Sequence, residues 1–207
     1  MHTPCNQMSE YEVLVALCMG IGLSAASGFR VFLPPFLLSL FVRYETVDID
    51  VKGTVFEYFD SDLAVILLGV ATIVELLAYY VPWVDNLLDS IASPAAVVAG
   101  SGMTGMLLEG STDPVLQWSL AIIAGGGVSA SVQGATVLTR GASSMLTGGI
   151  GNPAVSTIEN IASIAFALFA IMLPFLAALG AVMLVAVVVK KAMTRGSKIA
   201  QSNSPPG

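Results

Sequence analysis

Residues 153–189, PAVSTIENIASIAFALFAIMLPFLAALGAVMLVAVVV, decide the fold class because Glu159 is the single charged residue in these 37 positions. As one helix the stretch would be about 55 Å long, whereas the hydrocarbon core of a bilayer is about 30 Å thick. We therefore predict two membrane-crossing helices, 153–172 and 174–189, that turn near Pro174.

The other parts of the chain have the same apolar character. Of 207 residues, 56% are hydrophobic and 11% are charged, and the mean hydropathy is +0.85, which is typical of polytopic membrane proteins. We predict one all-α transmembrane bundle over residues 11–189, between an N-terminal tail (1–10) and a basic, disordered C-terminal tail (190–207). Its six crossings are 11–42, 63–81, 91–108, 115–138, 153–172 and 174–189.

The first apolar region, 11–42, is interrupted twice. Ser27-Gly28-Phe29-Arg30 and Pro34-Pro35 both disfavour a continuous helix. Because residues 31–42 are too few to cross a bilayer alone, we predict a single crossing by a broken or steeply tilted helix.

The polar loop 43–62 is acidic. Apolar Val47, Ile49 and Val51 alternate with aspartates, and Lys52-Gly53 follows them before a second short apolar run at 54–56. This pattern predicts a small extramembrane β-hairpin on the membrane surface. A solvated outer loop explains the acids without catalysis.

Basic residues fix the expected orientation. Lys190, Lys191, Arg195 and Lys198 follow the last crossing, and the positive-inside tendency places them in the cytoplasm. Counting back through six crossings puts the acidic loop outside and the N-terminus inside. A single tilted helix over 153–189 would instead put the N-terminus outside.

Composition and motifs exclude several classes of function. The net charge of −6 and the lack of basic clusters before the tail argue against nucleic acid as a partner. His2, Cys5 and Cys18 have no metal-site or CxxC spacing, and the chain has no GxSxG or Walker motif. We expect no enzymatic activity, catalytic residue, metal or cofactor, and membrane lipids as partners.

Three charged residues, Arg30, Glu75 and Glu159, lie inside apolar segments. A charge at the bilayer centre costs about 2.5–3.5 kcal/mol on insertion scales and often marks a functional site. We predict a midplane site for a small ion or molecule, with Arg30 holding negative charge, Glu75 exchanging protons, and Glu159 and Asn160 beside them. Alternatively, Arg30 forms a static pair with Glu75 or Glu159, and Glu159 interacts with a helix N-terminus.

Asp85 and Asp89 are four residues apart, on one face of a helix if the segment is helical. Two carboxylates at this spacing can share a cation. Solvation at an interface is the alternative.

Two weak internal similarities suggest a repeat. Gly22-Leu-Ser-Ala resembles Gly127-Val-Ser-Ala, and Asp89-Ser-Ile-Ala-Ser resembles Glu159-Asn-Ile-Ala-Ser. Duplication and chance in a composition rich in small residues both explain this. Separately, Gly126, Ala130 and Gly134 form a small-residue face suited to close helix contact, including contact within a homo-oligomer.

Three segments together carry a family resemblance: Gly22-Leu-Ser-Ala-Ala-Ser-Gly-Phe-Arg30, Pro82-Trp-Val-Asp-Asn-Leu-Leu-Asp89 and Gly151-Asn-Pro-Ala-Val-Ser-Thr-Ile-Glu159. They resemble domain of unknown function 4126, a family of bacterial membrane proteins, over about residues 13–188. The resemblance implies a multi-pass protein of the bacterial inner membrane and no particular substrate. Members often carry a second acid where this chain has Asn160, so a two-carboxylate metal site is not implied.

These observations favour a small transporter or channel-like protein. The alternative is a non-transporting accessory membrane protein, whose buried charges pair statically and whose small-residue faces bind a partner protein or lipid.

Overall fold

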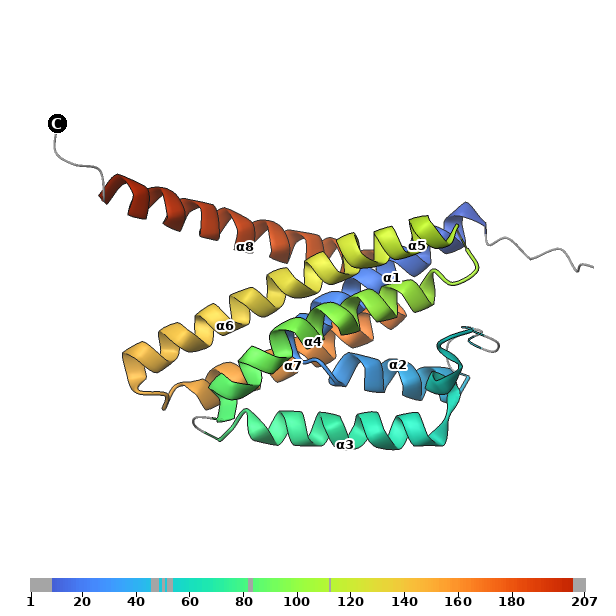
Figure 1. Ribbon diagram of the computed structural model, residues 1–207, viewed down its shortest axis with the longest axis horizontal. Helices are drawn as coiled ribbons and strands as arrows, with labels where there is room; N and C mark the ends of the chain where they lie inside the picture. The colour runs from blue at the N-terminus through green and yellow to red at the C-terminus, as the bar shows by residue number, and fades with distance from the viewer. Residues whose placement is uncertain are drawn as a thin grey trace, which may run out of the picture.

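The computed structural model describes residues 9–45, 49, 51, 54–81, 84–111 and 113–202, apart from the side chains of residues 86 and 195–202. These ranges form helices and short connections without a strand, which confirms the all-α class. The helices, shown in Figure 1, are α1 (Glu10–Phe29), α2 (Leu33–Arg43), the 3-10 helix η1 (Glu57–Asp60), α3 (Asp62–Ala78), α4 (Val84–Leu107), α5 (Pro114–Leu120), the π-helical segment η2 (Ala121–Gly126), α6 (Gly127–Thr147), α7 (Asn152–Met172) and α8 (Pro174–Ser202).

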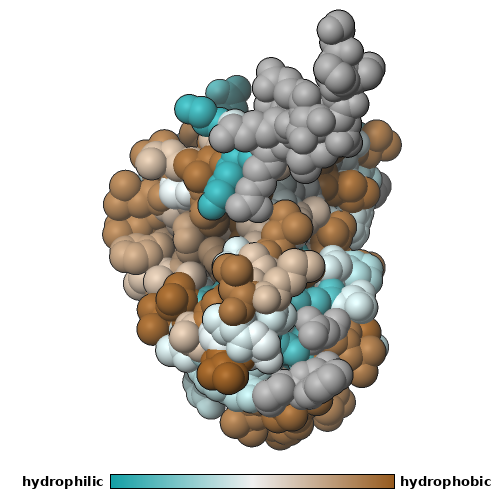
Figure 2. All heavy atoms as spheres, turned by 90° about the vertical axis from the view of Figure 1, so that its left-hand side faces the viewer, coloured by the Kyte–Doolittle hydropathy of each residue, from teal (hydrophilic) through white to brown (hydrophobic). Residues whose placement is uncertain are grey.

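Five helical segments are long and apolar enough to cross a membrane: α1, Leu87–Leu107 of α4, the continuous run Pro114–Thr147, α7, and Pro174–Thr194 of α8. Their outer faces carry exposed large apolar side chains, including Ile123 and Met183. Figure 2, an end view, shows hydrophobic residues bordering the molecule on several sides. These features indicate a multi-pass membrane protein.

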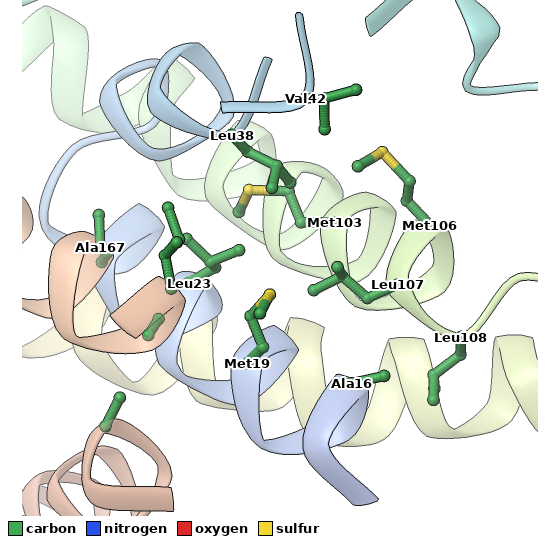
Figure 3. Packing of buried hydrophobic residues seen from close by; sticks show 14 of the residues in the cluster. Ala16, Met19, Leu23, Leu38, Val42, Met103, Met106, Leu107, Leu108 and Ala167 are labelled. Carbon is green, nitrogen blue, oxygen red and sulfur yellow. The ribbon is translucent and has the colours of Figure 1, made fainter. Parts of the chain in front are cut away.

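Helix α1 is the centre of the bundle, in contact with α4, α6, α7 and α8. Figure 3 shows Met19 and Leu23 of α1 packed among side chains from neighbouring helices, including Leu38 and Met103. Small residues on α1 permit this close approach: a Cβ added at Gly22 would lie 2.8 Å from the Cβ atoms of Ala170 and Ala177. The central position of α1 therefore depends on its glycines.

Residues 11–42 do not form a single crossing. Helix α1 ends at Phe29, and α2 begins at Leu33 and runs back toward the end of the bundle at which α1 starts, beside α3 (Figure 1). Pro34 and Pro35 fit the first turn of α2, where helix N–H groups have no intrahelical acceptor. The prolines therefore start a new helix here, rather than bending a continuous one.

The predicted β-hairpin is wrong for its second arm. Residues 54–56 form a bend and a turn that lead into η1, while residues 46–48, 50 and 52–53 of the hairpin lie outside the described residues. Arg43 Nε donates a hydrogen bond to Asp62 Oδ1 at 2.8 Å, which lowers the pKa of the Asp62 carboxyl. Local pairs of this kind, and not a sheet, organise the described part of the loop.

Two helices extend farther than their hydropathy indicates. The predicted crossing 115–138 belongs to a helical run that continues to Thr147 and ends at Gly148, whose φ of +63° is the left-handed cap that glycine favours. The tail expected to be disordered from residue 190 continues α8 to Ser202, and residues 203–207 lie outside the described residues. Residues 153–189 form two helices, since Leu173 separates α7 from α8.

The predicted small-residue face of α6 does not pack as a unit inside the bundle. Gly126 is buried against Ser101, whereas Ala130 and Gly134 are exposed and a Cβ at Gly134 would meet no atom within 4 Å. The buried face instead includes Ser129 and Val132. Because an α-helix has 3.6 residues per turn, a strict four-residue repeat moves about 40° around the helix at each step, and Ala130 and Gly134 turn away from the buried face.

Gly28 provides a test of the close packing on α1. A Cβ at Gly28 would lie 2.5 Å from Val132 Cβ and 2.8 Å from the Ser129 carbonyl oxygen. We expect Gly28→Ala to lower stability by about 1–3 kcal/mol, because overpacking forces helices apart. Thermal unfolding of the detergent-solubilised protein measures this, with Gly134→Ala as the matched control. Equal melting temperatures for the two variants would contradict the packing described here.

Candidate functional site

Two arginines and two carboxylates meet in the interior, where α1 ends. Arg30 Nη1 lies 3.0 Å from Glu159 Oε2, and Arg140 Nη1 lies 2.8 Å from Asp89 Oδ1. Arg140 Nε is also 3.4 Å from Glu159 Oε1, so Glu159 joins the two arginines. We call these four residues, together with Tyr79, the arginine network.

Tyr79 lies beside both guanidinium groups. Their Cζ atoms are 4.1 Å (Arg30) and 4.3 Å (Arg140) from the centroid of its ring, within cation–π distance. The Tyr79 hydroxyl donates to Asp89 Oδ1 at 3.3 Å, and its carbonyl accepts from Ser156 Oγ at 3.3 Å. Tyr79 thus links the end of α3 to residues of α1, α4, α6 and α7.

Arg30 has a complete set of partners. Its Nε donates to Asn160 Oδ1 at 2.5 Å, Nη1 to the Phe29 carbonyl at 2.9 Å and to Glu159, and Nη2 to the Ser156 carbonyl at 3.1 Å. Its side chain has no exposed surface. The structure therefore brings the predicted site residues Arg30, Glu159 and Asn160 together, with every guanidinium nitrogen of Arg30 engaged.

Glu75 binds the backbone just after Arg30, and not the Arg30 side chain. Its Oε1 accepts from the Val31 N–H at 2.7 Å, and Oε2 accepts from the Phe32 N–H at 3.0 Å. Both N–H groups belong to the break just before α2, where a carboxylate also meets the positive end of the helix dipole. Among the described residues, the ion pairs of Arg30 include Glu159 and not Glu75.

Arg140 is as deeply buried as Arg30 but has fewer hydrogen bonds. Nη2 donates to Thr136 Oγ1 at 3.3 Å, while Nε and Nη1 approach their carboxylates without hydrogen-bond geometry. Glu159 Oε1 likewise has no hydrogen-bond donor. The side-chain amide nitrogen of Gln133, two turns before Arg140 on α6, has no hydrogen-bond acceptor. Buried polar atoms left this way are uncommon in folded proteins and call for an explanation.

Asp85 and Asp89 both lie on α4 but engage different partners. Asp85 Oδ2 accepts from Asn152 Nδ2 at 2.5 Å, whereas Asp89 pairs with Arg140 and Tyr79. Within the described residues, no three His, Cys, Asp or Glu side chains form a group that could hold a metal ion. The two aspartates therefore extend the arginine network toward α7, Asp89 through its ion pair with Arg140 and Asp85 through its hydrogen bond from Asn152.

Two members of the network, Arg140 and Tyr79, were not predicted as site residues. The predicted crossing 115–138 ends before Arg140, although no Gly or Pro lies between Leu138 and Arg140 to end a helix. A tyrosine at the end of an apolar segment is typical of an interfacial anchor, but the exposed fraction of Tyr79 is 2%. The available signal was the second arginine of the internal similarity, which follows Gly127-Val-Ser-Ala as Arg30 follows Gly22-Leu-Ser-Ala.

The comparisons with known proteins identify a family. The family model described as Domain of unknown function (DUF4126) matches residues 17–193, which include every residue of the arginine network. No curated protein and no solved structure matches the chain.

Glu75 provides a test of the contacts at the helix break. We expect Glu75→Ala to lower the free energy of unfolding by about 2 kcal/mol or more, because two buried N–H groups lose their acceptor. Glu75→Gln keeps one acceptor oxygen and should lose less. Thermal unfolding in detergent measures the effect, with exposed Glu57→Ala as the control, expected to change stability by less than about 0.5 kcal/mol. If Glu75→Ala matches Glu57→Ala, the carboxylate does not stabilise the break.

Proposed function

The chain belongs to the DUF4126 family, and we propose that it is a small membrane carrier in which Arg140, Asp89 and Glu159 couple the movement of an anion to that of a proton. The observation that carries this proposal is the contrast between the two buried arginines. Every nitrogen of the Arg30 guanidinium donates a hydrogen bond, whereas Nε and Nη1 of Arg140 lie 3.4 Å and 2.8 Å from carboxylate oxygens without hydrogen-bond geometry. A purely structural pair favours saturation, as at Arg30, since unmet buried donors cost about 1–3 kcal/mol each.

The charges of the network favour paired uptake of a proton and an anion. Within the network, the two positive charges of Arg30 and Arg140 are balanced by Asp89 and Glu159. Two further buried carboxylates lie beside it: Glu75 accepts from the N–H groups of the helix break, and Asp85 accepts from Asn152. Protonation of Asp89 would remove one negative charge and leave Arg140 with a free interaction site. An anion bound there restores neutrality, so a proton and an anion enter in a one-to-one ratio.

The other buried charges serve as the fixed frame of this site. Arg30 joins the end of α1 to Glu159 and Asn160 of α7, and Glu75 joins α3 to the start of α2. Both groups have their polar atoms engaged by close partners. We therefore assign the proton exchange to Asp89 and Glu159, and a supporting role to Glu75.

The internal similarity supports a carrier. Its two halves exchange partners: Arg30 of the first half pairs with Glu159 of the second, and Arg140 of the second pairs with Asp89 of the first. Helices α1 and α6 run in the same direction, as do α4 and α7 (Figure 1). Transporters built from parallel repeats place their sites at the interface between the repeats.

The depth of the network sets the expected access route. Glu159 is seven residues after the start of α7, about 10 Å along a helix of 21 residues. The network therefore lies about 5 Å from the middle of α7, on the side of the bundle where α7 begins. Basic residues in the last part of α8, at 190–198, favour placing that end in the cytoplasm, with the start of α1 on the opposite side, in the inner membrane of a bacterium.

Proton flux into proteoliposomes tests this function. The full-length protein is reconstituted with an entrapped pH dye, and inward gradients of chloride, phosphate or succinate are imposed. We expect one of these anions to drive internal acidification above that of protein-free vesicles. Arg140→Gln and Asp89→Asn should each reduce the rate at least tenfold, because each removes one partner of the exchange.

Arg43→Gln is the matched control, since Arg43 is partly exposed and pairs with Asp60 and Asp62, far from the network in sequence and contacts. Its flux should equal that of the wild type. No anion-driven acidification in the wild type, or equal rates in Arg140→Gln and wild type, would overturn the carrier proposal.

One observation favours the accessory function instead. Two pockets, one between α6 and α8 and one on α7, contain no residue of the arginine network. A static network contributes only to structure, and apolar residues of similar size can then replace a buried ion pair without loss of stability. Under this alternative, Asp89→Leu combined with Arg140→Met preserves the melting temperature, and the wild type shows no flux.

A further inference from the structure

A groove between α6 and α8 lies outside the arginine network. Its volume is about 390 Å³, and its walls include Ala135, Leu138 and Ala142 of α6 and Val187 and Val188 of α8. These walls are apolar, and the side chain of Lys191 lies among the lining residues. The groove therefore combines a hydrocarbon-like surface with one ammonium group.

Lys191 lacks an acidic neighbour on the helices that form the groove. Residues 114–158 and 160–207 contain no aspartate or glutamate, so neither α6 nor α8 supplies a carboxylate. Among the ion pairs of the described residues, none involves Lys191. Within the described part of the chain, no carboxylate therefore compensates the positive charge at the groove.

The order of residues along α8 matches the layers of a bilayer. The apolar run from Pro174 ends at Val189, and Lys191 follows at the level expected for lipid headgroups. On α6 the groove extends from Ala135 to Ala142, about 10 Å along the helix. This length suits the part of one acyl chain nearest the headgroup. The small alanine side chains leave room for that chain between α6 and α8.

We propose that this groove binds an anionic phospholipid, with its phosphate at Lys191 and one acyl chain against Ala135, Ala142 and Val187. A second copy of the chain would place an apolar helix in the groove and leave the Lys191 ammonium without a counter-charge. A phosphate neutralises it, and lysines near an anionic leaflet gain about 1 kcal/mol each. The site is independent of the proposed transport function.

Native mass spectrometry of the delipidated full-length protein tests the site. The protein is titrated in detergent with phosphatidylglycerol and with phosphatidylcholine of the same acyl chains. We expect wild type to retain phosphatidylglycerol preferentially. Lys191→Ala should weaken its binding about fivefold, the ratio that corresponds to about 1 kcal/mol.

Two further variants separate the groove from general surface charge. Lys190→Ala removes the neighbouring charge, which is outside the lining of the groove, and should change affinity less than twofold. Ala142→Trp fills the groove and should remove the tightly held lipid; if this variant misfolds, the comparison of Lys191→Ala with Lys190→Ala still decides. Equal retention of both lipids, equal effects of the two lysine variants, or a dimer that Ala142→Trp abolishes would overturn the proposal.

Discussion

The burial of Arg30 at the end of α1 is the interaction on which the arrangement of the other helices depends. An unpaired guanidinium in this interior would be strongly destabilising, and removing one partner of a buried pair costs about 3–5 kcal/mol. Glu159, Asn160 and the Ser156 carbonyl, all of α7, surround it. The same break that places Arg30 inward exposes two N–H groups, and Glu75 accepts both. One interruption of one helix thus fixes α2, α3 and α7 around α1.

Much of this architecture can be predicted from the sequence, because the breaks are local. Prolines and glycines mark the ends of α1, α6 and α7, and the apolar runs indicate an all-α bundle. The direction of α2 after the break could not be predicted, since it depends on contacts with α3 that are distant in sequence. The second arm of the predicted hairpin, 54–56, failed for a similar reason: a short apolar run forms a strand only where a partner strand pairs with it.

The candidate site shows where hydropathy misleads. Arg140 was excluded because a crossing of typical length ends before it, although the helix continues until a glycine stops it. Glu75 stood out as a lone charge in an apolar helix, but its oxygens are occupied by backbone N–H groups. The position of Glu159 near a helix N-terminus could explain its charge from the sequence, yet it joins both arginines. Charged residues are so rare in the apolar segments that the sequence alone indicates which ones are buried. Their roles depend on which partners the fold places beside them.

Helix α6 connects the two regions proposed to bind ligands. Thr136 and Arg140 lie on its buried face, and Leu138 and Ala142 lie on the face that lines the groove against α8. Helix α8 is the least buried of the five long apolar segments, so its contact with α6 is the least constrained by the bundle. A lipid in the groove would influence Arg140 only if it bound one arrangement of α6 and α8 more tightly than another. Arg140 of α6 has fewer hydrogen bonds than Arg30, whose saturated contacts hold α1 and α7 together.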